Sequence, residues 1–295
     1  MAEIIDGNKV SSEIREKIKQ EVSFFKKKTG MVPGLAVVMV GENPASASYV
    51  RMKGKRCDEA GINSWQYNFS DNINEKDLLD LIERLNRERD VHGILVQLPL
   101  PSHINEKKII ESIDPMKDVD GFHPVNVGRM MIGDDDCFFP CTPYGIQELI
   151  TRHVKDLKGK HLVVVGRSNI VGKPVANMML QKKDRANCVV TVCHTAAPDI
   201  GYFTRQADIL VVAAGKANMV TGAMVKPGAV VIDVGMNRIA DPSDKTKTLL
   251  TGDVNFEEVS KIASAITPVP GGVGPMTIAM LLKNTLKAFV LQNRL

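Results

Sequence analysis

The sequence has little of what marks secreted, metal-binding or nucleic-acid-binding proteins. Its five cysteines are odd in number and include no Cys-x-x-Cys pair, which argues against a disulfide framework and against a zinc site. Aromatic residues make up only 5% of the chain, and the net charge is only +4. Neither a base-stacking surface nor a strongly basic patch is indicated. We therefore expect a protein of a reducing compartment that binds neither a metal ion nor nucleic acid.

Long apolar runs are also missing. No run reaches the length that is needed to cross a bilayer, and the start Met-Ala-Glu-Ile-Ile-Asp-Gly lacks the pattern of a signal peptide. We expect a cytoplasmic protein with no membrane contact. What is present is ordinary in amount, since 295 residues with 44% hydrophobic side chains suffice for two compact domains.

The second half of the chain contains four apolar runs that stop abruptly in glycine or small polar residues, at 161–168, 189–195, 209–215 and 229–237. Runs of β-branched residues without polar alternation are typical of strands buried on both faces of a parallel sheet. The segments 170–183 and 198–205 are long enough for crossover helices or turns. The glycines thus gather at the carboxyl ends of the strands, which is where open α/β sheets bind ligands.

The first half shows a second α/β pattern, with predicted strands at 34–41 and 93–100 and predicted helices at 10–28, 45–60 and 75–89. We predict an α/β protein with two α/β domains flanking a cleft, the second a Rossmann-like doubly wound parallel sheet. The predicted domains are 1–145 and 146–277, joined by a helix at 143–153, with a C-terminal helix at 278–295 that packs back at the junction. A polar stretch at 241–247 is predicted to be an exposed hairpin tip.

The turn Gly166-Arg-Ser-Asn-Ile-Val-Gly172 is related to the dinucleotide-binding fingerprint, although Ser168 replaces its second glycine and the spacing is longer. A strand precedes this turn and a helix follows, so backbone N–H groups at the helix start would face a pyrophosphate. Enzymes that use NAD usually carry an acidic residue at the end of the next strand. Here Cys193-His194-Thr195 has none, and Arg167 and His194 could attract a 2′-phosphate, so NADP is favoured. The alternative for Arg167 is a solvated surface charge.

The segment 43–61 predicts a helix that Asn43 can cap and Gly61 can end. Helical spacing puts Lys53 on a less polar stripe with Tyr49 one turn away. Desolvation lowers the pKa of an ammonium group, which prepares a lysine for proton transfer near neutral pH. Tyr49 could hydrogen-bond the amine or a substrate. The alternative is a lysine that merely covers apolar surface with its stem.

Residues 267–277, Thr-Pro-Val-Pro-Gly-Gly-Val-Gly-Pro-Met-Thr, combine glycines and prolines directly before an apolar segment at 278–291. Glycine lets a ligand touch the main chain, and proline fixes the backbone, so the pattern is typical of a rigid wall fitted to a flat ligand. The alternative is a tight helix entry with Pro275 in the first turn.

These motifs, together with Val96-Gln97-Leu-Pro-Leu-Pro101 and Lys117-Asp-Val-Asp120-Gly-Phe122, resemble the bifunctional methylenetetrahydrofolate dehydrogenase/methenyltetrahydrofolate cyclohydrolase family along essentially the whole chain. The resemblance implies NADP-dependent oxidation of 5,10-methylenetetrahydrofolate, followed by hydrolysis of the methenyl product to 10-formyltetrahydrofolate in one-carbon metabolism. One alternative is another two-domain NADP-dependent oxidoreductase, similar to shikimate dehydrogenase, which would not explain the Gln-Leu-Pro-Leu-Pro strand end. A second is a non-catalytic nucleotide-binding regulator, against which Lys53 and Asp120 argue.

The resemblance also implies roles for particular residues and a homodimer. Lys53 would transfer protons, with Gln97 holding its amine and Tyr49 in support. A carboxylate at Asp120 suits the two parallel donors of a pterin ring, although Asp120 could equally be a turn residue. The implied substrate-binding residues are Tyr49, Lys53, Gln97, Asp120, Pro268 and Gly272. The implied NADP-binding residues are Gly166, Arg167, Ser168, Thr195, Met236, Gly272 and Thr277, of which Met236 has a packing alternative.

Overall fold

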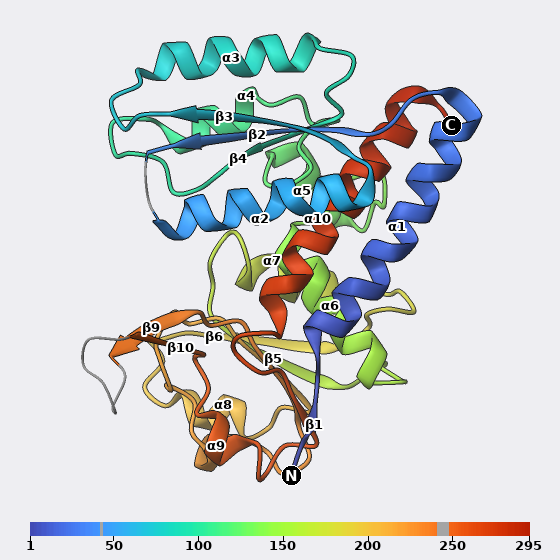
Figure 1. The fold of residues 1–295 in the computed structure, drawn as a ribbon. Helices are drawn as coiled ribbons and strands as arrows, with labels where there is room; N and C mark the ends of the chain where they lie inside the picture. The colour runs from blue at the N-terminus through green and yellow to red at the C-terminus, as the bar shows by residue number, and fades with distance from the viewer. Residues whose placement is uncertain (42–43, 241–247) are drawn as a thin grey trace. The chain divides into compact units, whose positions relative to one another are not determined.

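The protein forms two compact α/β units in a computed structural model (Figure 1) that describes residues 1–41, 44–240 and 248–295. One, the six-stranded unit, comprises residues 1–11 and 142–277; the other, the three-stranded unit, comprises residues 12–141 and 278–295. The predicted α/β class with two domains is confirmed. The predicted cap at Asn43 and the predicted hairpin tip at 241–247 lie outside the described residues.

The six-stranded unit is built on a parallel sheet whose strand order is β1-β11-β8-β7-β5-β6. The chain runs from β5 outward to β6 and then returns across β5 to β7, so the strand order reverses between β5 and β7. In such sheets ligands bind at the carboxyl ends of the strands beside this switch point. The strands are β1 (Glu3–Ile4), β5 (His161–Val165), β6 (Val189–Cys193), β7 (Ile209–Val212), β8 (Val230–Asp233) and β11 (Ala265–Ile266).

Helices cover both faces of this sheet, α7 on one side and α8 and α9 on the other (Figure 1). Val163 and Val165 pack with the side chains around α8 and α9, whereas Leu162 and Val164, also fully buried, point to the opposite face because strand side chains alternate. The remaining elements of the unit are α6 (Cys141–His153), α7 (Gly172–Leu180), α8 (Ile200–Thr204), the 3₁₀ helix η1 (Gly222–Met224), α9 (Phe256–Val259) and the antiparallel pair β9 (Asn237–Ala240) and β10 (Thr248–Thr251).

One strand departs from the sequence prediction. The run at 189–195 was expected to be buried on both faces, but Val189 and Val192 of β6 are 59% and 43% exposed. The reason is position, because β6 is the last strand of the sheet and, in the part of the chain that the structure describes, pairs with β5 alone. A β-branched run is also compatible with such an edge strand.

The three-stranded unit holds the parallel sheet β3-β2-β4, with α2 and α3 on opposite faces (Figure 1). Ala36 and Val38 of β2 pack with Leu78 and Ile82 of α3 in its core. The elements are α1 (Gly7–Thr29), β2 (Gly34–Val40), α2 (Pro44–Ala60), β3 (Asn63–Phe69), α3 (Glu75–Arg87), β4 (Gly93–Val96), α4 (Glu106–Ser112), α5 (Pro124–Ile132) and α10 (Val273–Asn293). The helices predicted at 10–28, 45–60 and 75–89 correspond to α1, α2 and α3.

The unit boundaries differ from the predicted domains 1–145 and 146–277 at the start of the chain. Residues 1–11 belong to the six-stranded unit because β1 pairs with β11, Glu3 opposite Ala265. Residues 278–295, by contrast, belong with residues 12–141. A strand of two residues gives no periodic signal in the sequence, so its distant partner could not be predicted.

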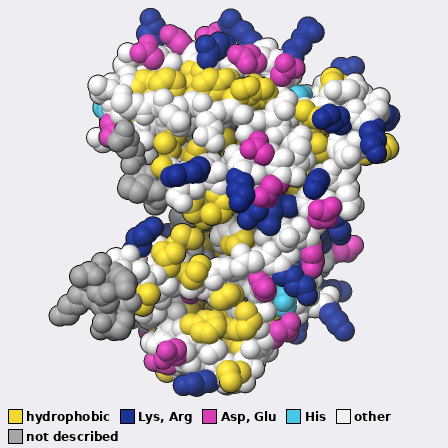
Figure 2. Space-filling view, in the orientation of Figure 1, with side chains coloured by type: hydrophobic (Ala, Val, Ile, Leu, Met, Phe, Trp, Pro, Cys, Tyr) yellow, Lys and Arg dark blue, Asp and Glu magenta, His cyan; other side chains and the backbone are white. Residues whose placement is uncertain are grey.

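Charges of both signs are interspersed on the face seen in Figure 2, as a net charge of +4 leads one to expect. None of the helices within the described parts of the chain is long and apolar enough to span a membrane.

Candidate active site

Lys53, the predicted proton carrier, is buried and hydrogen-bonded within the three-stranded unit. Its side chain is only 6% exposed, and its Nζ donates to Oε1 of Gln97 at 2.9 Å. Gln97 follows β4, and its own Nε2 donates to the carbonyl of Leu98 at 2.9 Å, so its amide is fixed with the oxygen toward the lysine. Exposed charges such as Arg51 and Lys55 lie on other sides of α2. The predicted amphipathic placement of Lys53 is confirmed.

Burial and the neighbouring acidic groups act in opposite directions on the pKa of Lys53, and burial has the larger effect. Burial lowers the pKa of Lys53 below the ordinary lysine value, and the carboxylate of Asp120 opposes that shift. Burial in turn raises the pKa of Asp120, with Lys53 opposing. Tyr49, one helical turn before Lys53, is half-buried, and burial raises the pKa of its phenol. A lysine in this setting can accept a proton nearer to neutral pH than a solvated one.

The turn that presents Asp120 is held by a neighbour that the sequence did not single out. The buried carboxylate of Asp118 accepts from the backbone N–H groups of Phe122 at 3.2 Å and His123 at 2.8 Å. It also accepts from Nδ2 of Asn126 at 2.8 Å. Burial raises the pKa of Asp118 to about 7, although these hydrogen bonds oppose the shift. The only hint in the sequence was the Asp-x-Asp spacing, and it did not show which aspartate holds the turn.

Asn284 of α10 hydrogen-bonds to the backbone of this region, although it is far away in the sequence. Its Nδ2 donates to the carbonyls of Val119 at 2.8 Å and Phe139 at 2.9 Å. The Cys141 thiol lies beside the same carbonyls, donating to that of Val119 at 3.4 Å. Burial, with Asp120 nearby, raises the pKa of Cys141 well above its usual value, which favours the protonated thiol over the reactive thiolate.

In the six-stranded unit, the predicted phosphate turn is tightly folded at the carboxyl end of β5. Gly166 has a φ of +132°, and a Cβ there would lie 2.2 Å from the carbonyl oxygen of Ala213. A Cβ at Gly172 would lie 2.3 Å from the carbonyl oxygen of Gly166. Both positions therefore require glycine. The Oγ of Ser168 accepts from the backbone N–H groups of Val171 at 3.1 Å and Gly172 at 3.3 Å, and its hydroxyl proton remains to be donated.

The other predicted cofactor residues follow neighbouring strands. Arg167 and Thr195 are exposed after β5 and β6, and Met236 is 49% exposed after β8. No carboxylate stands at the end of β6, where an NAD-specific enzyme would place one. Thr277 lies in α10, and its hydroxyl pairs with that of Thr142 at 2.9 Å.

The glycine- and proline-rich segment has a packing role of its own. A Cβ at Gly272 would meet the Pro268 carbonyl oxygen at 2.6 Å, and one at Gly7 would meet the Gly272 carbonyl oxygen at 1.8 Å. The start of α1 thus packs directly against this segment. Close packing accounts for glycine at 272 without a ligand, while Pro268 remains half-buried at the carboxyl end of β11.

Each unit therefore gathers one group of predicted residues. Lys53 and Gln97 form a hydrogen bond, with Asp120 and Tyr49 near Lys53 in the three-stranded unit. In the six-stranded unit the residues that follow the strands share the carboxyl edge of one sheet: Gly166, Arg167, Ser168, Thr195, Met236, Pro268 and Gly272. Across the described residues, no group of three or more His, Cys, Asp or Glu side chains could hold a metal ion.

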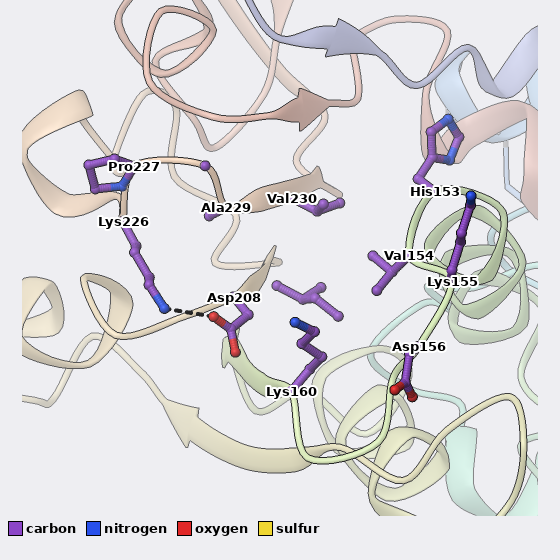
Figure 3. A pocket seen from close by; sticks show the side chains of 12 residues that line it. His153, Val154, Lys155, Asp156, Lys160, Asp208, Lys226, Pro227, Ala229 and Val230 are labelled. Atoms are coloured by element: carbon purple, nitrogen blue, oxygen red, sulfur yellow. Dashed lines mark hydrogen bonds and ion pairs between the residues drawn. The ribbon is translucent and has the colours of Figure 1, made fainter.

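A separate cavity of about 390 Å³ lies at the opposite, amino-terminal edge of the six-stranded sheet (Figure 3). Lys155, Lys160 and Lys226 line it, and Lys226 Nζ pairs with Asp208 Oδ1 at 2.6 Å. None of the predicted site residues is among the lining residues. This cavity is therefore distinct from the candidate active site.

Comparison with known proteins covers nearly the whole chain. Residues 5–120 match the family described as "Tetrahydrofolate dehydrogenase/cyclohydrolase, catalytic domain". Residues 140–293 match "Tetrahydrofolate dehydrogenase/cyclohydrolase, NAD(P)-binding domain". The "Bifunctional protein FolD" of Prosthecochloris aestuarii is 59% identical over 293 residues, which is 99% of both chains.

Comparison with solved structures leads to the same family. The bifunctional FolD methylenetetrahydrofolate dehydrogenase/cyclohydrolase of Campylobacter jejuni has a TM-score of 0.93 and 50% identity, covering 100% of both chains. The Trypanosoma brucei methylenetetrahydrofolate dehydrogenase-cyclohydrolase, solved with NADP and an inhibitor, has a TM-score of 0.94 and 40% identity, covering 100% of this chain and 99% of that one. The two alternatives, a shikimate-dehydrogenase-like enzyme and a non-catalytic regulator, are not favoured by these matches.

Proposed function

The chain belongs to the tetrahydrofolate dehydrogenase/cyclohydrolase family, and from this premise we propose which of its residues serve each of the two reactions. The protein oxidises 5,10-methylenetetrahydrofolate to the 5,10-methenyl form with NADP, and then hydrolyses that product to 10-formyltetrahydrofolate. It serves one-carbon metabolism. The observation that carries the proposed division is the buried Lys53–Gln97 pair beside Asp120.

The oxidation places few demands on acids and bases. A carbon held between two nitrogens loses hydride readily, since a nitrogen lone pair stabilises the cation that forms. Bound NADP supplies the hydride acceptor. The chain's task is to position the folate, and Asp120 can accept from the two parallel donors of the pterin ring. Tyr49 can stack on that ring or hydrogen-bond to it.

The hydrolysis needs a proton carrier. Water forms a C–O bond with the methenyl carbon and loses one proton, which gives a carbinolamine. The carbinolamine hydroxyl loses the second proton as the C–O double bond forms and the C–N bond breaks. The released ring nitrogen gains one proton, and the other proton leaves to solvent. Neutral Lys53 would accept the proton from water and return it to the nitrogen. Gln97 holds the amine in place, because its oxygen accepts from Nζ and its own N–H₂ group is engaged by Leu98.

The phosphate turn fits NADP on its own chemistry. Glycines at 166 and 172 keep the turn tight at the start of α7, where backbone N–H groups attract phosphates. Arg167, with Ser168 and Thr195, would hold the phosphates, and the missing carboxylate after β6 leaves room for a 2′-phosphate. Met236, Pro268, Gly272 and Thr277 would line the nicotinamide and folate side.

The protein would act in the cytoplasm as a homodimer. All five cysteines are buried and none of them forms a disulfide, which fits a reducing compartment. The dimer follows from the family resemblance, and β3 supports it: within the described residues β3 pairs with β2 alone, so it has a backbone edge available for pairing. Light scattering on the purified protein measures the mass.

Assays of both half-reactions test the function directly. Purified protein should reduce NADP when given methylenetetrahydrofolate and should convert methenyltetrahydrofolate to the 10-formyl form. Repeating the first assay with NAD measures the cofactor preference. Failure of both conversions under fresh, reducing conditions would reject the proposal.

A further inference from the structure

Two buried aspartates at the carboxyl edge of the six-stranded sheet have no part in the proposed chemistry. Asp233 ends β8 and is 3% exposed, and Asp253, which follows β10, is 0% exposed. Burying a carboxylate is costly unless hydrogen bonds satisfy it. Their hydrogen bonds therefore indicate what these residues are for.

Asp253 joins two segments that leave neighbouring strands. Its Oδ2 accepts from the backbone N–H groups of Ala214 at 2.6 Å and Gly215 at 2.8 Å, directly after β7. Its Oδ1 accepts from Nδ2 of Asn237 at 2.8 Å, after β8. One carboxylate thus sets the path of the chain beyond both strands.

Asp233 holds Asp253 in place through the main chain. Its Oδ1 accepts from the N–H groups of Asp253 and Gly235, each at 2.9 Å, and its Oδ2 accepts from that of Val254 at 3.0 Å. The packing leaves no room for a side chain at residue 252, since a Cβ at Gly252 would lie 1.7 Å from Oδ2 of Asp233. The two carboxylates and their loops form one closely fitted network.

This network borders the residues to which cofactor binding is proposed. Ala213, the residue before Ala214, packs its carbonyl against Gly166, where a Cβ would approach to 2.2 Å. Met236 stands between Gly235, held by Asp233, and Asn237, held by Asp253. A change in either aspartate would therefore move the backbone beside Gly166 or Met236.

We propose that Asp253 is a positioning residue for the dinucleotide site, anchored by Asp233, which shapes the chain after β7 and β8 to receive the nicotinamide half of NADP. This inference rests on the proposed function and adds residues to it. Asp253 touches no reacting atom and acts through the backbone that it holds.

Measuring both activities distinguishes a role in NADP binding from a role in overall stability, because the hydrolysis consumes no dinucleotide. Asp253→Ala leaves the N–H groups of Ala214 and Gly215 without their acceptor, and we expect the KM for NADP to rise about tenfold or more. Cyclohydrolase kcat/KM should change less than about twofold in the same preparation. Asp253→Asn keeps one acceptor oxygen and should give a smaller rise, and it decides the question if the alanine variant does not fold.

Asp208→Ala is the matched control. Asp208 also accepts a backbone N–H, that of His161 at 2.9 Å, and pairs with Lys226, but at the amino edge of the same sheet (Figure 3). It should leave the KM for NADP unchanged. An unchanged KM in both Asp253 variants, or a proportional fall of both activities, would overturn the inference. Wild-type protein lacking both activities would instead refute the proposed function.

Discussion

At the scale of single residues, the chemistry depends on how Lys53 is surrounded. A buried amine, an amide oxygen 2.9 Å away and a nearby carboxylate make a site in which small changes of charge alter protonation. Burial favours the neutral amine and Asp120 favours the charged one. The rate of hydrolysis should therefore rise with pH as Lys53 loses its proton, with a midpoint below the ordinary lysine pKa of about 10.4.

Gln97→Glu tests this balance. A carboxylate in place of the amide oxygen would stabilise the ammonium form of Lys53, and we expect the midpoint of the cyclohydrolase pH profile to move up by about one unit or more. The dehydrogenase profile should move little, because hydride transfer needs no proton from Lys53. Gln66→Glu, on the partly exposed β3, controls for added negative charge. Identical profiles for wild type and Gln97→Glu would contradict the role of Gln97.

Arg167→Ala tests cofactor selection at one side chain. If the guanidinium binds the 2′-phosphate, its loss should raise the KM for NADP roughly tenfold and leave that for NAD nearly unchanged. Arg205, an exposed arginine of the same unit paired with Asp199 at 3.0 Å, provides the control variant Arg205→Ala. Equal effects of Arg167→Ala on both cofactors would show that Arg167 does not read the 2′-phosphate.

Single-residue predictions from sequence succeeded where local spacing carries the information. Helical periodicity placed Lys53 on the buried stripe, and the structure confirms its burial beside Gln97. Asp118 was missed because two aspartates in one turn have the same local sequence signal, and only the fold shows that the Asp118 carboxylate accepts the backbone N–H groups of Phe122 and His123. Asp253 was missed because its partners follow other strands.

At the scale of elements, continuous apolar runs predicted β2, β4, β5, β6, β7 and β8, and helix signals predicted α1, α2 and α3. β3 was not predicted, although its polar residues alternate with Trp65, Tyr67 and Phe69, which pack against the core, and such alternation is a strand pattern. β1 and β11 were not predicted because two residues form no pattern. Periodicity therefore carries information only for elements long enough to show a pattern, and pairing between distant short segments has to come from the structure.

Helix α10 supplies a test at this scale. Asn284→Ala removes the side chain that donates to both the Val119 and the Phe139 carbonyls, and we expect the free energy of unfolding to fall by about 2 kcal/mol. Because Val119 precedes Asp120, the KM for the folate should rise as well. Denaturant unfolding and steady-state kinetics measure the two effects.

The matched control lies on the same helix. Gln292 Nε2 also donates to two backbone carbonyls, those of His92 and Met116 at 2.8 and 2.9 Å, but neither adjoins Asp120. Gln292→Ala should destabilise the protein without changing the KM for the folate. A normal folate KM in Asn284→Ala would remove Asn284 from the support of Asp120.

At the scale of the whole molecule, the order of the motifs along the chain was the strongest evidence for the family. Motifs spread from Tyr49 to Thr277 identified the family, and matches over residues 5–120 and 140–293 bear this out. The predicted domain limits left residues 1–11 in the first domain, whereas these residues join 142–277. The C-terminal helix at 278–295, predicted to pack back at the junction, belongs with residues 12–141. Sequence order does not reveal such exchanges, because they depend on contacts such as β1 with β11.

The central claim is that the hydrolysis requires Lys53 as a proton carrier, whereas the oxidation does not. The most direct measurement is the ratio of dehydrogenase to cyclohydrolase activity in Lys53→Met, with Lys55→Met, an exposed neighbour on α2, as control. We predict that hydrolysis falls by about 100-fold or more while measurable NADP reduction persists, and that Lys55→Met keeps the wild-type ratio. Full retention of hydrolysis in Lys53→Met would contradict the account.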